Sequence, residues 1–96
     1  MAIFLEIVTS PNCPHSPKAV KLAQEILKKT KGIGFREVNM ITEWGMQRAQ
    51  AFGVTATPTI ILNGRVIFVG IPEKKALERV LKDEIRKERE KQSYFF

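Results

Sequence analysis

A proline-rich turn at residues 9–17 most constrains the fold of this chain, because it separates two segments with different hydrophobic periods. Residues 3–8 form a short run of mainly apolar and β-branched side chains, which is typical of a strand. Residues 18–29 instead repeat apolar side chains at helical spacing, with lysine and glutamate on the opposite face. The sequence therefore predicts a strand, a turn and an amphipathic helix.

A second strand is predicted at residues 35–40, and the crossover between the two strands is long enough to carry a helix. Strands joined in this way run parallel, with a right-handed connection. The turn at residues 9–17 is therefore expected at the carboxyl end of the first strand, where open α/β sheets place their chemistry.

The middle of the chain predicts a short helix and a hairpin. Thr42 is a candidate N-cap for a helix through Phe52. The dipeptide Asn63-Gly64 separates two runs rich in β-branched residues, at residues 54–62 and 65–69. Asn-Gly favours a type I′ turn, so we expect these two runs to form antiparallel strands.

A last helix begins at Pro72, and its apolar stripe ends near residue 85. Residues 86–96 are interpreted as a charged helical extension followed by an aromatic tail. At 96 residues the chain can bury one hydrophobic core but not two. We expect a single domain over residues 1–96, with its core in residues 2–85.

Composition excludes several classes of protein. The net charge is +6, but lysine and arginine alternate with glutamate along two helices and no aromatic-basic cluster accompanies them. No apolar run reaches the roughly 20 residues that span a membrane, and no signal-type pattern opens the chain. We expect a cytoplasmic monomer that binds neither nucleic acid nor membrane. Few asparagines and glutamines beside abundant charged residues predict a thermophilic source.

The turn at residues 9–17 contains the chain's only cysteine and only histidine, Cys13 and His15. Pro14 suits the first position of a helix, which would place Cys13 at the N-cap. There the unpaired N–H groups of the first helical turn, the helix dipole and a protonated His15 would lower the thiol pKa. A lone cysteine is often an inert core residue, but this polar turn is a poor place to bury one. One cysteine and one histidine cannot complete a zinc site, and we expect no metal or other cofactor.

Two segments resemble a known family. The first is Thr9-Ser10-Pro11-x-Cys13-Pro14-His15-x-Pro17, which resembles the active-site segment of the small archaeal thioredoxins, also described as glutaredoxin-like, and of one unit of archaeal protein disulfide oxidoreductases. The second is Phe52-Gly53-Val54-x-x-Thr57-Pro58-Thr59, which resembles the cis-proline segment of the thioredoxin fold. The resemblance implies an α/β, thioredoxin-like fold in the order β-α-β-α-β-β-α, with a four-stranded mixed sheet and helices on both faces.

The resemblance also implies a thiol–disulfide oxidoreductase whose nucleophile is Cys13, flanked by Pro14 and His15. Its partners would be protein disulfides and a thiol reductant or reductase. Thr57 and Pro58 would form a ledge for an extended substrate. A glycine follows the hairpin in the family, and Gly70 stands there in this chain.

The chain departs from the family at Ser16, where those proteins carry a second cysteine. A serine can hydrogen-bond to the Cys13 thiolate but cannot resolve a mixed disulfide. The chain is therefore either a natural one-cysteine relative or a cysteine-to-serine variant. Three functions stay open: an oxidoreductase impaired at its resolving position, a monothiol enzyme that removes glutathione from proteins, and a redox-inactive binding module.

Two further family features are in doubt. The glutathione-binding Gly-Gly-x-Asp pattern of glutaredoxins is absent after the hairpin, where residues 69–72 read Val-Gly-Ile-Pro. Many thioredoxins carry a buried acid in the strand before the active site, and Glu6 is the nearest candidate here. Strand alternation leaves open which face of the sheet Glu6 points to.

Overall fold

A computed structural model describes residues 3–93 of the chain. Its elements are β1 (Ile3–Thr9), α1 (Ser16–Lys28), β2 (Ile33–Asn39), α2 (Glu43–Ala51), β3 (Thr59–Leu62), β4 (Arg65–Val69) and α3 (Lys74–Ser93). The expected β-α-β-α-β-β-α order is confirmed. The aromatic tail expected at the end of the chain, at residues 94–96, lies outside the described residues.

The four strands form one mixed sheet in the order β2-β1-β3-β4. β1 and β2 are parallel, whereas β3 is antiparallel to both β1 and β4. Asn63 and Gly64, between β3 and β4, have φ values of 48° and 78°, the left-handed pair that a type I′ turn requires. The strand before this turn begins only at Thr59, because Pro58 has no N–H for the ladder and residues 54–58 form a loop.

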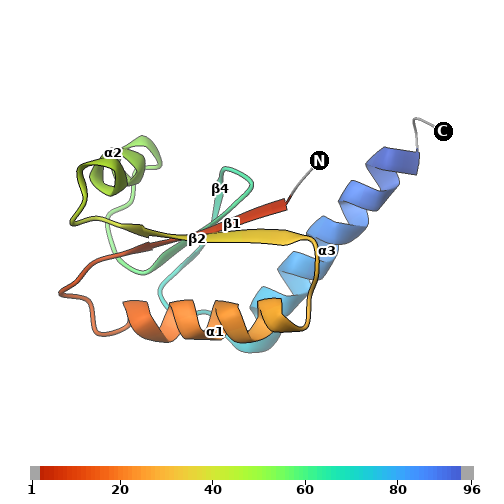
Figure 1. Ribbon diagram of the computed structural model, residues 1–96, viewed down its shortest axis with the longest axis horizontal. Coiled ribbons are helices and arrows are strands. Elements are labelled where there is room, and N and C mark those ends of the chain that lie inside the picture. Colours follow the sequence, from red (N-terminus) through yellow and green to blue (C-terminus); the bar gives the residue numbers. More distant parts are fainter. Residues whose placement is uncertain (1–2, 94–96) are drawn as a thin grey trace.

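Helices cover both faces of the sheet. α1 and α3 lie on one face and α2 lies on the other (Figure 1). The larger core, on the face of α1 and α3, consists of Ile3, Leu5, Ile7, Ala19, Ala23, Ile26, Ile60, Leu62, Leu77 and Leu81. A smaller cluster against α2 consists of Val8, Val38, Ala49 and Ile61.

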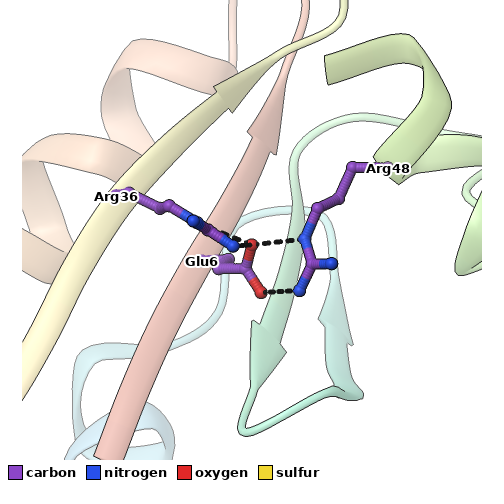
Figure 2. Close-up of polar contacts among 3 residues, drawn as sticks. All are labelled: Glu6, Arg36 and Arg48. Carbon is purple, nitrogen blue, oxygen red and sulfur yellow. Dashed lines mark hydrogen bonds and ion pairs between the residues drawn. The ribbon is translucent and has the colours of Figure 1, made fainter. Parts of the chain in front are cut away.

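A buried carboxylate lies on the α2 face of the sheet. Glu6 is only 3% exposed and accepts hydrogen bonds from Arg36 of β2 and Arg48 of α2 (Figure 2). Arg48 binds both carboxylate oxygens, with Nε and Nη2 each at 2.7 Å, in a bidentate arrangement. The hydrogen bond from Arg48 lowers the pKa of Glu6 most, Arg36 adds to this effect, and burial opposes it. Glu6 therefore connects three elements on the face opposite α1.

Helix α3 extends past the core. Leu77 and Leu81 are fully buried, but most side chains of residues 86–91 are exposed and the helix continues to Ser93. In Figure 1 these last turns project beyond the sheet. The molecule is consequently elongated, with principal extents of 47 × 25 × 17 Å. Within residues 3–93, no helix has the length and apolar character needed to cross a membrane.

Candidate active site

Cys13 lies in the turn before α1 and not at the helix N-cap. Helix α1 begins at Ser16, its N-cap residue is His15, and Pro17 occupies the first turn. The prediction that Cys13 caps the helix was therefore wrong. Proline is preferred in the first helical turn, and the sequence offers one at position 14 and another at position 17, but only Pro17 lies in that turn.

The sulfur of Cys13 is partly exposed and faces the loop before β3. Its Sγ lies 3.2 Å from the backbone carbonyl oxygen of Thr57, to which the thiol donates. The side-chain hydrogen bond with Ser16 is the main cause that lowers the pKa of Cys13 to about 7. A side-chain hydrogen bond with Thr57 and the backbone N–H groups of His15 and Ser16 act in the same direction, and burial opposes them.

The expected lowering of the thiol pKa is therefore present, with a different principal cause. We expected the N–H groups at the start of the helix, the helix dipole and a charged His15 to stabilise the thiolate of Cys13. The N–H groups of His15 and Ser16 do contribute, but the hydrogen bond with the Ser16 side chain contributes most, and the side chains of Pro14 and His15 are exposed. A hydrogen bond to the charged form favours ionisation without any neighbouring charge.

The loop facing Cys13 contains Thr57 and Pro58, joined by a cis peptide bond. Pro58 is buried, and its carbonyl oxygen accepts a hydrogen bond from the N–H of Gly70 at 2.7 Å. Gly70 has φ of 91°, in the region that favours glycine. The fold thus brings together a sulfur from the first turn, the proline loop and the residue after β4.

A cleft of about 310 Å³ opens beside Cys13 on the side of Ser16. Its lining residues are Thr9, Ser10, Pro11, Cys13, Ser16, Pro17, Val20, Glu37 and Asn39. Ser16 is 3% exposed, and its hydroxyl oxygen accepts a hydrogen bond from the backbone N–H of Ser10 at 3.4 Å. Ser16 therefore places a buried hydroxyl at the edge of an open cleft.

Sequence reasoning missed two residues of this cleft, Glu37 and Asn39. They lie at the end of β2, paired in register with Ile7 and Thr9 of β1. Because the carboxyl ends of parallel strands meet at one edge of a sheet, the predicted parallel pair contained the signal needed to find them.

Known proteins are similar to this chain over most of its length. The thioredoxin domain family matches residues 4–82. A thioredoxin of Methanocaldococcus jannaschii is 35% identical over 81 residues, which cover 83% of this chain and 93% of that protein. A probable thioredoxin of Archaeoglobus fulgidus is 26% identical over 80 residues, which cover 83% and 87% of the two chains.

Among solved structures, thioredoxin-2 of the malaria parasite superposes with a TM-score of 0.74 at 17% identity. The superposition covers 85% of this chain and 82% of that one. At this identity the likeness concerns the fold, and it agrees with the strand and helix order described above.

Proposed function

The chain belongs to the thioredoxin domain family, and from that membership we propose that Cys13 is the nucleophile of a thiol–disulfide oxidoreductase. The observation that carries the proposal is the position of its Sγ, 3.2 Å from the Thr57 carbonyl oxygen and next to the Pro58 loop. With a pKa of about 7, about half of the Cys13 side chains are thiolate at neutral pH. The thiolate is the form that attacks disulfides.

The proposed reaction begins with attack by the Cys13 thiolate on a disulfide of a substrate protein. One substrate sulfur leaves as a thiolate, and the other stays bound to Cys13 in a mixed disulfide. Thr57 and Pro58 support the substrate chain next to the sulfur, and the open space around Gly70 lets a backbone approach. The low pKa of Cys13 also makes it a good leaving group when the mixed disulfide is broken.

Ser16 divides the proposed cycle into two parts. Its hydroxyl stabilises the Cys13 thiolate but has no sulfur with which to displace the bound substrate. This chain therefore performs the first step alone and needs an external thiol, supplied by a reductant or a reductase, for the second. The proposal describes a single-domain monomer working in the cytoplasm on protein disulfides, with no nucleic acid or membrane partner and no cofactor.

The test is reduction of insulin disulfides with dithiothreitol, comparing this chain with Ser16→Cys and with Cys13→Ser. Ser16→Cys supplies the missing sulfur, so its rate should exceed that of this chain by at least about tenfold, and Cys13→Ser should match the reaction without protein. Equal rates for Ser16→Cys and Cys13→Ser would contradict the oxidoreductase and leave a binding module.

A second function, removal of glutathione or another small thiol from proteins, is favoured by the cleft beside Ser16. Its volume of about 310 Å³ lies at the lower end of the range of small-molecule sites. If this function holds, the unmodified chain releases glutathione from a glutathionylated protein when a small thiol is added, and Ser16→Cys brings little improvement. Release measured by mass spectrometry separates the two functions.

A further inference from the structure

The cleft and the substrate ledge, which is formed by Thr57 and Pro58, lie on different sides of Cys13. The Sγ atom contacts the Thr57 carbonyl, yet neither Thr57 nor Pro58 lines the cleft, which is bounded instead by Ser16 and the end of β2. An attacking thiolate must approach a disulfide sulfur in line with the bond that breaks. When a substrate occupies the ledge, a second thiol can therefore reach Cys13 from the side of the cleft.

Glu37 is the only acidic or basic side chain among the described residues that line the cleft. The hydroxyl of Thr9 donates to Oε2 of Glu37 at 2.6 Å, which holds the carboxylate at the cleft wall. No lysine or arginine within residues 3–93 lies within ion-pair distance of it. The negative charge of Glu37 is therefore fixed in place, and no ion pair with a described residue cancels it.

We propose that this cleft admits the small thiol that completes the exchange, and that Glu37 makes the cleft selective for thiols that carry an ammonium group over thiols that carry a carboxylate. The inference rests on the proposed function, since it assigns the class of co-substrate to the same sulfur. The net charge of +6 attracts anions to the molecule as a whole, so the preference is a local property of the cleft.

The proposed thiol–disulfide exchange at the cleft takes place in two steps. In the first, the thiolate of the small thiol attacks Cys13 Sγ, a new sulfur–sulfur bond forms, and the substrate sulfur leaves as a thiolate. In the second, another small thiolate attacks the sulfur of the bound small thiol, which releases the Cys13 thiolate and a small-molecule disulfide. Two small thiols are oxidised for each substrate disulfide that is reduced.

The test uses the full chain with Cys13 converted to its mixed disulfide with thionitrobenzoate. Release of the coloured thionitrobenzoate anion reports attack on Cys13 Sγ. Three thiols of similar size are compared at equal thiolate concentration: cysteamine, which is cationic, mercaptoethanol, which is neutral, and mercaptopropionate, which is anionic. The measured quantity is the ratio of the cysteamine rate to the mercaptopropionate rate.

Glu37→Gln should lower this ratio by about three- to tenfold, because an exposed charge makes only a modest contribution for each thiol. The difference should shrink as salt is added. Glu25→Gln is the matched control, since Glu25 is an exposed carboxylate of α1 that lines a different groove, and its ratio should equal that of the unmodified chain. An unchanged ratio in Glu37→Gln, or equal changes with all three thiols, would overturn the inference.

Asn39→Asp provides a second arm that leaves the contact between Thr9 and Glu37 in place. It adds a carboxylate to the same cleft, so the ratio should rise, and a ratio that stays constant contradicts the inference. Failure of the proposed function gives a different result. In that case Cys13 does not form the mixed disulfide at neutral pH, or none of the three thiols releases thionitrobenzoate.

Discussion

The hydroxyl of Ser16 and the sulfur of Cys13 form the central pair of this protein at the scale of single residues. Ser16 is buried, and its hydrogen bond is the main cause of the lowered pKa of Cys13. In the function proposed above, the same side chain activates the nucleophile and leaves the resolving step to an external thiol.

Removing that hydroxyl gives the first prediction. In Ser16→Ala the pKa of Cys13 should rise from about 7 toward the ordinary value of about 8.5, because the main stabilising hydrogen bond is lost. The pH dependence of alkylation by iodoacetamide measures this shift, with the rate falling as pH drops through the pKa in each protein.

Lys18→Gln is the control for this measurement, because it removes an exposed positive charge from the first turn of α1 and leaves the hydrogen bonds to Cys13 intact. Its alkylation midpoint should equal that of the unmodified chain. A midpoint that moves in Lys18→Gln and stays fixed in Ser16→Ala would mean that charge, and not hydrogen bonding, activates the sulfur.

At the scale of elements, the first turn of α2 is fitted closely against the end of β2. The Thr42 hydroxyl donates to the Asn39 carbonyl at 2.8 Å and accepts from the N–H of Gly45 at 2.9 Å. A methyl group on Gly45 would clash with the backbone carbonyl of Asn39. Glycine is therefore required here by close approach of backbone, and not by a left-handed φ.

Gly45→Ala is the second prediction. Alanine is a better helix former by about 1 kcal/mol, but the clash should outweigh this gain and lower the free energy of unfolding by about 1–3 kcal/mol. Urea unfolding measures the change. Gln47→Ala, at an exposed position of the same helix, should be neutral or slightly stabilising. A Gly45→Ala protein as stable as the unmodified chain would show that α2 can move away from β2.

The order of the elements could be predicted because each depends on local chemistry. The Asn63-Gly64 turn and the Thr42 cap follow from backbone preferences that hold in any context. The start of α1 could not be predicted, since the two prolines at positions 14 and 17 give equivalent signals. The start of β3 was placed too early, because the β-branched residues Val54, Thr55 and Thr57 favour a strand although this segment forms a loop.

Residues of the candidate site could be predicted from the sequence where they belong to a motif within one continuous segment. Cys13 and the Thr57-Pro58 loop belong to recognisable motifs. Glu37 was missed because only the pairing of β2 with β1 brings it to the cleft. The orientation of Glu6 stayed open for the same reason, since its partners lie on other elements and no local pattern identifies them.

At the scale of the whole molecule, Glu6 connects β1 to β2 and α2 through Arg36 and Arg48 (Figure 2). Removing one partner of a buried, hydrogen-bonded charge leaves the other groups unsatisfied. This arrangement joins the two layers on one side of the sheet, where the apolar cluster is small.

Acid sensitivity is the third prediction. The pKa of Glu6 is lower in the folded chain than the ordinary value of about 4.3, so its contribution to stability is complete above that pH and is lost as pH falls through the folded pKa. Glu6→Gln should therefore be less stable at neutral pH, by about 1–3 kcal/mol, and lose less stability on acidification. Urea unfolding across the acidic range measures both.

Glu78→Gln is the control for this series, because Glu78 is a carboxylate of α3, which lies on the face of the sheet opposite α2 (Figure 1). Its acid dependence should match that of the unmodified chain. Parallel stability curves for Glu6→Gln and the unmodified chain would show that the carboxylate is not what couples folding to pH.

The projecting end of α3 affects how the molecule moves in solution. A compact chain of this length has a radius of gyration of about 12.5 Å, and the value here is 13.8 Å. An elongated particle tumbles more slowly end over end than it spins about its long axis. Amide relaxation rates should therefore depend on bond orientation, and a single correlation time will not describe residues 3–93.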